Sequence, residues 1–294
     1  MTFKNSFSQG GGGRVTTSSG GGGGLPIVVG GGGIGTLVIL ALVYFLGGGT
    51  GTESLPSAGH SSNPGSYNLD HCQSEGAANE YDDCRVEATM YSVDAVWQAV
   101  LPQQAGIEYT QPGMHLFENS VATGCGNASA STGPFYCPSD TTAYLDVSFF
   151  QQLGQLGGSN GPLAQEYAIA HEIGHHIQNL EGTLGLSDYN NPGEDSAAVA
   201  IELQADCYAG LWAKRASEGE DAMLEPISRK QLSEALQTAR AIGDDNIQKR
   251  SGGQINPDAW THGSSEQRED AFMAGYESGV MSSCDFLHRG GYSS

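Results

Sequence analysis

The stretch YAIAHEIGHHIQNLEG, residues 167–182, decides the fold of this chain. It opens with good helix formers and ends at a glycine, a residue that commonly terminates helices, so it predicts a helix. Residues four apart on a helix share one face, so His171 and His175 can direct two imidazole nitrogens at a single ion. Glu172 lies one step round, where it suits a general base, because a catalytic zinc site takes three protein ligands and keeps one place for water.

A third ligand is expected on a second helix further along the chain. Glu202 lies 27 residues after His175 and begins the pattern Glu-Leu-Gln-Ala-Asp. A spacing of four stacks its carboxylate on the same helix face as that of Asp206. We predict that Glu202 binds zinc and that Asp206 accepts the outer N–H of a ligand histidine, which fixes the tautomer of that ring. The neighbouring His176 points to a different face and is interpreted as a hydrogen-bonded structural histidine.

The N-terminal part is unlike the rest of the chain. Residues 1–24 are rich in glycine, with Lys4 and Arg14 as their only charges, and are interpreted as a flexible basic tail. Residues 25–46 contain no charge over 22 positions, which is long enough for a transmembrane helix. Only residues 37–46 are densely apolar, so a cleaved signal peptide is the alternative to a permanent anchor. We favour the anchor, because the basic tail is long for a signal peptide.

Charge predicts how the chain is oriented and what it binds. Basic residues stay cytoplasmic, so the tail predicts a single-pass protein of the cell membrane with an extracytoplasmic main part. Beyond residue 46 the chain has 10 basic and 33 acidic residues, a net charge of −23 with histidine neutral. Nucleic acid is excluded as a partner, because phosphate binding needs a Lys/Arg footprint. The expected partners are a peptide or protein substrate and, through the span, the membrane; the oligomeric state is left open.

The six cysteines agree with an oxidising compartment. Six cysteines allow about 15 different pairings, so any assignment from the sequence is a hypothesis. We favour two local loops with 11 intervening residues each and one long-range bridge, namely Cys72–Cys84, Cys125–Cys137 and Cys207–Cys284.

The chain divides into a stalk and one large domain. Residues 47–70 are rich in Gly, Ser, Thr and Pro and are interpreted as a stalk. Residues 71–294 are long enough for a single hydrophobic core and contain no second composition break and no internal repeat. This stretch is therefore expected to be the extracytoplasmic catalytic domain.

Periodicity within that domain predicts mainly helices. Helices are expected over residues 77–100, ending before Pro102, and over residues 225–241 and 266–277. Residues 143–150 alternate apolar and polar side chains, as in a half-buried strand. This strand is either an exposed edge that holds an extended substrate or an ordinary core strand. The expected fold class is α+β, mainly helical with a small sheet.

A set of motifs, in this order, resembles the bacterial family named "putative neutral zinc metallopeptidase" over nearly the whole chain. The motifs are Gly124-Cys125-Gly126, Gly133-Pro134-Phe135-Tyr136-Cys137-Pro138, His171-Glu172-Ile173-Gly174-His175-His176, Glu202-Leu203-Gln204-Ala205-Asp206-Cys207, Ala241-Ile242-Gly243-Asp244-Asp245 and Thr261-His262-Gly263-Ser264 with Gln267-Arg268. The resemblance implies a membrane-anchored, zincin-like peptidase domain with one zinc ion on His171, His175 and Glu202 and with Glu172 catalytic. It implies no particular substrate.

The last of these motifs looks like the Thr-His-Pro-Ser element of related membrane-bound zinc peptidases. We hypothesise that His262 donates a hydrogen bond to the tetrahedral oxyanion, because negative charge develops there in the transition state. Arg268 is expected to hold a carboxylate or a backbone carbonyl nearby. The alternative is that His262 caps the start of the last helix.

The predicted function is zinc-dependent hydrolysis of peptide bonds, with Glu172 as the general base that takes a proton from an activated water. One alternative is an extracellular binding or scaffolding module with a non-catalytic zinc site. Structural zinc sites are closed by four protein ligands, so three ligands beside a free glutamate favour an enzyme. The other alternative is a zinc amidase acting on a non-peptide amide such as a cell-wall linkage, which would use the same residues.

Overall fold

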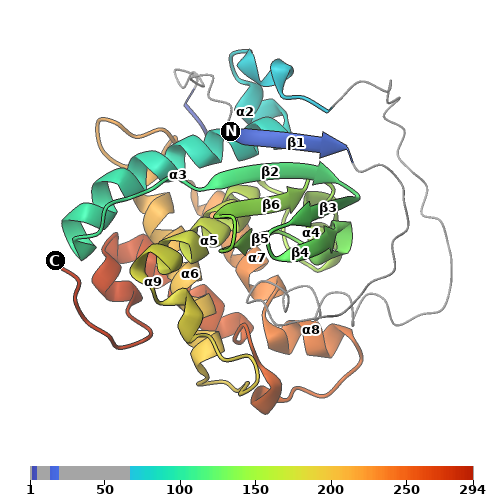
Figure 1. Ribbon diagram of the computed structural model, residues 1–294, viewed down its shortest axis with the longest axis vertical. Coiled ribbons are helices and arrows are strands. Elements are labelled where there is room, and N and C mark those ends of the chain that lie inside the picture. The colour runs from blue at the N-terminus through green and yellow to red at the C-terminus, as the bar shows by residue number, and fades with distance from the viewer. Residues whose placement is uncertain (1, 5–13, 20–66, 294) are drawn as a thin grey trace, which may run out of the picture.

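The computed structural model describes residues 2–4, 14–19 and 67–293 of the chain (Figure 1). The predicted span, residues 25–46, and most of the stalk lie outside these residues. Among the residues that are described, no helix is both long enough and apolar enough to cross a membrane. The membrane anchor therefore stays a prediction from the sequence.

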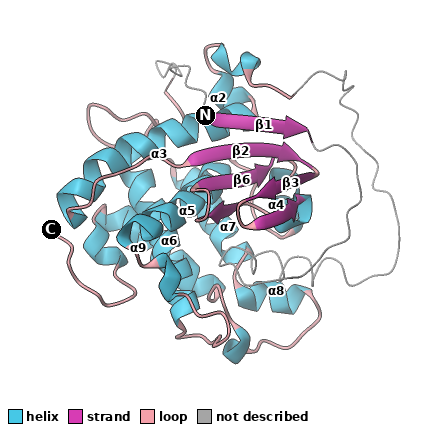
Figure 2. Ribbon diagram, in the orientation of Figure 1, coloured by secondary structure: helices cyan, strands magenta, loops and turns pink. Residues whose placement is uncertain are grey.

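Helices make up most of the domain, and the strands gather in one part of it (Figure 2). The long helices are α3 (Asp82–Ala105), α5 (Pro162–Glu181), α6 (Ala197–Ser217), α7 (Arg229–Ala241) and α9 (Ser265–Ser278). Shorter helices are α2 (Ala77–Glu80), α4 (Phe149–Gln155) and α8 (Asp244–Arg250). The core between them contains large buried side chains, including Trp97, Tyr167, Tyr208, Trp212 and Phe272.

A mixed sheet of four strands lies beside these helices. In spatial order the strands are β1 (Val15–Ser19), β2 (Gly113–Glu118), β6 (Thr142–Asp146) and β5 (Phe135–Cys137). The pairs β1–β2 and β2–β6 are parallel, and β5 pairs antiparallel with β6. The strands β3 (Ser120–Thr123) and β4 (Gly126–Ser129) form a separate antiparallel pair. The α+β class, mainly helical with a small sheet, is thus confirmed.

Two predicted elements differ in the structure. The helix expected over residues 77–100 is interrupted at Tyr81, whose backbone is extended, so α2 and α3 are separate helices. The helix that was expected to end before Pro102 continues to Ala105, because Leu101 and Gln104 are buried and the proline lies in the last turn. A proline there removes only one helical hydrogen bond, since it lacks an N–H. The helix ends at Gly106, whose left-handed conformation (φ 68°) lets its N–H reach the Pro102 carbonyl.

The strand expected over residues 143–150 is shorter and lies inside the sheet. It ends at Asp146, whose carboxylate accepts hydrogen bonds from the backbone N–H groups of Ser148 and Asn119, both at 2.8 Å, and so turns the chain into α4. Because β6 lies between β2 and β5, its edges are paired. The substrate-edge interpretation of this strand is wrong, and it is an ordinary core strand.

The predicted disulfides are confirmed. The sulfur atoms of Cys72–Cys84, Cys125–Cys137 and Cys207–Cys284 are bonded in the three pairs expected from the sequence. The helix predicted over residues 225–241 is present as α7 but begins only at Arg229, because Ser228 caps it, and the helix predicted over residues 266–277 is present as α9.

The described parts of the N-terminal tail lie on the domain. Residues 14–19 contribute β1 to the sheet, and Phe3 is 2% exposed and forms an isolated bridge with Leu224. The sequence predicted a flexible tail here, which differs from the structure. The short stretch of Val and Thr that makes the strand lies between two glycine runs, and these dominate the composition.

Candidate metal centre

The helix α5 is built to carry side chains into the interior. Pro162 stands at its first position, where the missing N–H costs nothing, and Gly182 ends it in a left-handed conformation (φ 70°). Gly174 allows a close approach to α6, because a Cβ atom there would lie 3.0 Å from the Cα atom and the carbonyl oxygen of Ala205. This contact brings the His-Glu-x-x-His face of α5 against the face of α6 that carries Glu202.

Three buried side chains offer ligand atoms to one point. The Nε2 atom of His171 lies 3.3 Å from Glu202 Oε2, and that of His175 lies 3.7 Å from Glu202 Oε1. One ligand atom from each of the three residues lies within 4.8 Å of the others. Burial alone would raise the pKa of Glu202, but the imidazoles of His175 and His171 outweigh it and hold that pKa well below its usual range. The carboxyl is therefore ionised and ready to bind a cation.

The outer nitrogens of the two imidazoles are held by other residues. The Nδ1 atom of His171 lies 2.8 Å from Asp206 Oδ1, and the Nδ1 atom of His175 lies 2.8 Å from the amide oxygen of Gln178. Because oxygen acceptors face both Nδ1 atoms, each ring carries a proton there, and Nε2 is the atom that would bind a metal. This is the tautomer that the sequence interpretation of Asp206 required.

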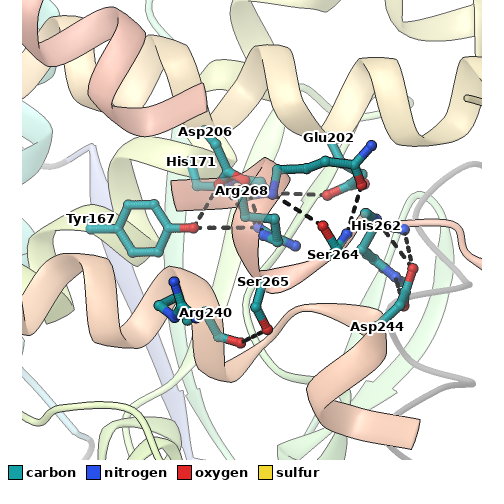
Figure 3. A network of polar contacts seen from close by, with 12 residues as sticks. Tyr167, His171, Glu202, Asp206, Arg240, Asp244, His262, Ser264, Ser265 and Arg268 are labelled. Carbon is teal, nitrogen blue, oxygen red and sulfur yellow. Dashed lines mark hydrogen bonds and ion pairs between the residues drawn. The ribbon is translucent and has the colours of Figure 1, made fainter. Parts of the chain in front are cut away.

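Asp206 belongs to a buried network that contacts Nδ1 of His171, the ring nitrogen that does not face Glu202 (Figure 3). Arg268 places Nε 2.9 Å from Oδ2 and donates from Nη2 to Oδ1 at 3.0 Å. The hydroxyl of Tyr167 donates to the same Oδ1 at 2.6 Å. Burial opposes ionisation of Asp206, but Arg268 and His171 outweigh it and lower its pKa. Arg268 thus holds a carboxylate of the protein itself, and Tyr167 is a member of the network that the sequence did not reveal.

Gln178 is a second residue that the sequence did not reveal. Its side-chain amide donates to the Ile201 carbonyl at 2.7 Å and to the Gln204 side chain at 3.0 Å, while its oxygen faces His175. It therefore fixes the ring of His175 and ties α5 to α6 at once. Its position three residues after His175, on the same helix face, is the local signal that would have found it.

Glu172 lies against the sheet, next to the ligands. Its carboxylate accepts a hydrogen bond from the backbone N–H of Tyr136 in β5, and burial raises its pKa. A raised carboxyl pKa lies closer to neutral pH, and a group with such a pKa can both accept and release a proton. Tyr189 lies beside Glu202; burial and the Glu202 charge raise the pKa of its hydroxyl.

A pocket opens beside these residues. Its polar wall includes His171, Glu172, Glu202 and His262. The rest of the wall is mainly apolar and is formed by Pro134, Phe149, Leu156, Ala168, Ile242 and Ile247. The arrangement can hold an apolar group beside the three candidate metal ligands.

His262 reaches this pocket from the loop before α9. Its backbone N–H donates to Asp244 Oδ2 at 2.7 Å, and its Nδ1 lies 3.2 Å from Asp244 Oδ1 (Figure 3). Burial lowers the pKa of this imidazole, but the Asp244 carboxylate outweighs burial and raises it. Its Nε2 atom is buried and has no hydrogen-bond partner.

The alternative role for His262, as the cap of the last helix, is wrong. Ser264 caps α9, because its side chain accepts the Gln267 N–H. The structure also places His176 away from the site, where its Nδ1 lies 2.9 Å from the Tyr136 hydroxyl and its Nε2 lies 2.6 Å from the Thr110 carbonyl. Both of its nitrogens are engaged, as expected for a structural histidine.

The donor set suits zinc. Two imidazole nitrogens and one carboxylate are a common protein ligand set of catalytic zinc. The Oε2 atom of Glu202 is buried without a hydrogen-bond partner, and such an atom needs an explanation, which a bound cation provides. A buried His-His-Glu group on helices packed beside a small mixed sheet is typical of the zincin-like fold, the fold of many zinc metallopeptidases.

Comparison with known proteins agrees with this class. Residues 9–287 match the family model described as "Putative neutral zinc metallopeptidase", and the chain belongs to this family. It is 49% identical over 225 residues to the uncharacterized protein Rv2575 of Mycobacterium tuberculosis, covering 74% of this chain and 75% of that protein. It is 40% identical over 191 residues to the uncharacterized protein YpfJ of Escherichia coli K12, covering 62% and 64%. No solved structure matches the chain.

Proposed function

We propose that this chain is a zinc-dependent peptidase in which Glu172 is the general base. The observation that carries the proposal is that buried His171, His175 and Glu202 offer ligand atoms to one point, while the buried carboxylate of Glu172 lines the same pocket as His171 and Glu202. A structural zinc site would be closed by a fourth protein ligand. Here the residue next to the donors is a carboxylate with a raised pKa, which suits proton transfer.

Each residue of the site has a distinct role in this proposal. His171, His175 and Glu202 would hold the zinc ion, which when bound supplies a Lewis acid that activates water and polarises a carbonyl. Glu172 takes a proton from the attacking water and passes it to the leaving amine. Asp206 and Gln178 keep the two imidazole rings in the required tautomer.

His262 is proposed to stabilise the transition state. Its unpartnered Nε2 atom lines the same pocket as Glu172 and Glu202. The Asp244 carboxylate raises the pKa of the ring and so favours the protonated form, in which Nε2 has a hydrogen to donate to the oxyanion. We expect His262→Ala to lower kcat by roughly 100-fold to 1,000-fold, the usual cost of an oxyanion donor, while zinc content stays unchanged.

The pocket indicates a substrate with an apolar side chain next to the cleaved bond. Phe149, Ile242 and Ile247 form part of its wall, and burial of an apolar side chain against them is favourable. Among the described strands, β5 pairs only with β6, and Pro134, directly before it, lines the pocket. An extended peptide could therefore add to β5 by backbone hydrogen bonds and place one side chain in the pocket.

We also propose that the catalytic domain works outside the cytosol on a peptide or protein, and that it binds no nucleic acid. The three disulfides support an oxidising compartment. The excess of acidic residues is unfavourable for phosphate backbones. The alternatives with a non-peptide amide or with no catalysis are outcomes of the experiment below.

The test is zinc content and cleavage of a diverse peptide library by the purified full chain. Glu172→Gln is the variant, and Glu277→Gln, which changes an exposed glutamate of α9, is the matched control. We expect stoichiometric zinc in all three proteins and loss of cleavage only in Glu172→Gln. Zinc without cleavage in any of them would favour a non-peptide amide or a binding module. Normal cleavage by Glu172→Gln would refute the assignment of the base.

A further inference from the structure

The strand β1 is held on the domain by side chains as well as by backbone pairing. Thr16 places its hydroxyl 2.7 Å from His115 Nδ1, and Ser18 places its hydroxyl 2.8 Å from Nε2 of the same ring. Thr17 donates its hydroxyl to the Tyr67 carbonyl. The strand pairs in parallel with β2 in a defined register, with Thr16 opposite His115. Both nitrogens of one domain histidine are thus engaged by this one short strand.

Arg14, directly before β1, neutralises a buried acidic group of the domain. Its guanidinium forms an ion pair with Asp94 of α3 and donates to the Pro112 carbonyl at 3.2 Å. The side chain of Asp94 is 5% exposed and also accepts from the Tyr109 hydroxyl and the Gln111 amide. Arg14 is the cation that faces this carboxylate, and a buried carboxylate without a cation is costly.

Residues 2–4 bind a second part of the domain surface, around Asn79. The side chain of Asn79 accepts from the backbone N–H groups of Thr2 and Phe3, at 3.0 and 3.2 Å, and donates to the Phe3 carbonyl at 2.9 Å. Backbone hydrogen bonds join Lys4 to Met223 and Glu225 to Thr2. An asparagine that both donates to and accepts from the backbone of a passing chain recognises the chain in an extended form.

Residues 2–4 also contact α5, the helix that carries the proposed catalytic residues. Thr2 donates its hydroxyl to Oε1 of Glu166, a residue of α5 that is 0% exposed. The other oxygen of Glu166 is buried without a hydrogen-bond partner, and Arg85 Nε lies 4.0 Å from the carboxylate. The hydroxyl of Thr2 therefore satisfies part of a carboxylate that the domain alone leaves poorly partnered.

We infer that residues 2–4 and 14–19 are the ligand of a built-in docking site on the catalytic domain, formed by α2, α3, β2 and α5. The chain leaves the described part after Ser19 and returns at Tyr67, and the hydrogen bond from Thr17 to Tyr67 keeps both ends together. A segment that crosses a bilayer once has its two ends on opposite sides. Docking therefore requires that residues 14–19 lie on the same side of the membrane as the domain.

Labelling of the full chain in intact cells tests this inference. Ser19→Cys reports on the docked segment and Ser251→Cys on the domain, and both positions are exposed. The six native cysteines are all in disulfides, so each variant offers one free thiol to a membrane-impermeant maleimide. We expect equal labelling of both variants. Both are labelled in intact cells if the two positions face outward, and both only after lysis if the two positions face the cytoplasm. Labelling of Ser251→Cys in intact cells with Ser19→Cys labelled only after lysis would overturn the inference.

Hydrogen exchange on the purified full chain tests the docking itself. Backbone amides of residues 15–19 should exchange at least about tenfold more slowly than in an unstructured chain. Arg14→Gln and Asp94→Asn should each remove most of this protection, and their combination should remove no more than either alone. Lys249→Gln, which changes an exposed lysine of α8, is the control and should leave residues 15–19 protected. Unprotected amides in the parent chain, or protection lost on dilution together with a dimer, would reject docking within one chain.

Discussion

The carboxylate of Asp206 contacts a candidate metal ligand on one side and an arginine on the other: Oδ1 lies 2.8 Å from Nδ1 of His171, and Oδ2 lies 2.9 Å from Nε of Arg268. An isolated buried carboxylate beside a ligand histidine would pull a second proton onto the ring and reduce its ability to bind a metal. Burial and Arg268 oppose that proton, but the Asp206 carboxylate outweighs them and raises the pKa of His171 to about 10. Zinc binding must therefore displace a proton from this ring.

Asp206→Asn should weaken zinc binding by roughly 10-fold to 100-fold, the usual effect of removing the hydrogen-bond partner of a ligand histidine. The amide cannot replace the charge, so Arg268 is left buried and unbalanced, and the variant should also be less stable. Competition with a chelator measures the affinity. Asp221→Asn, at an exposed position, is the control, and equal zinc affinity in the two variants would contradict the role of Asp206.

Gln178→Ala should weaken zinc binding about 10-fold through His175, because nothing else is found to hold the Nδ1 atom of that ring among the described residues. It also leaves the Ile201 carbonyl and the Gln204 amide oxygen without their donor, at a cost of about 1–3 kcal/mol each when buried. Calorimetric zinc titration and thermal unfolding of the metal-free protein separate the two effects. A variant that unfolds earlier but binds zinc normally would show that Gln178 only ties the helices together.

The sequence predicted those parts of the site that depend on local spacing. His171, His175 and Glu172 lie on one helix, and Glu202 and Asp206 lie four residues apart on another. Helical geometry was therefore sufficient to predict which of these side chains share a face. The contact between Asp244 and His262 joins residues 18 apart through loops, and no periodicity reports it. The strand β1 was missed because its partner β2 lies almost 100 residues further along the chain and the strand itself is short.

Glycines at the crossing of α6 and α9 predict a large effect on stability. A Cβ atom at Gly275 would lie 1.9 Å from the Cys207 carbonyl oxygen, and one at Gly210 would lie 2.0 Å from the Phe272 carbonyl oxygen. Both obstacles are backbone atoms, so the helices must separate to admit a methyl group. Gly275→Ala should therefore cost about 3 kcal/mol, at the upper end of the usual cost of overpacking.

The matched control for that substitution is Gly154→Ala in α4, where a Cβ atom meets nothing within 4 Å. Alanine is the better helix former, so this variant should be neutral or more stable by about 0.5–1 kcal/mol. Chemical denaturation of both variants gives the two free energies of unfolding. A Gly275→Ala protein as stable as the control would mean that α6 and α9 do not cross at these glycines.

Stability should depend on pH through Glu181, near the end of α5. Burial raises the pKa of its carboxyl to about 7, although hydrogen bonds from the Tyr208 and Tyr292 hydroxyls act in the opposite direction. The other charged groups that affect it are Arg289, which lowers the pKa, and Asp285, which raises it. Because the folded state holds this proton up to about pH 7 and the unfolded chain releases it near the ordinary pKa of 4.5, the free energy of unfolding falls as pH rises between these values.

The shift corresponds to about 3 kcal/mol of stability that is present below pH 4.5 and lost by about pH 7. Glu181→Gln removes the titrating group while keeping an acceptor for the two tyrosine hydroxyls. The difference in unfolding free energy between pH 5 and pH 8 should therefore shrink in this variant and stay unchanged in the exposed control Glu277→Gln. Urea unfolding at the two pH values gives this difference, and an equal pH dependence in all three proteins would mean that Glu181 keeps an ordinary pKa in the folded chain.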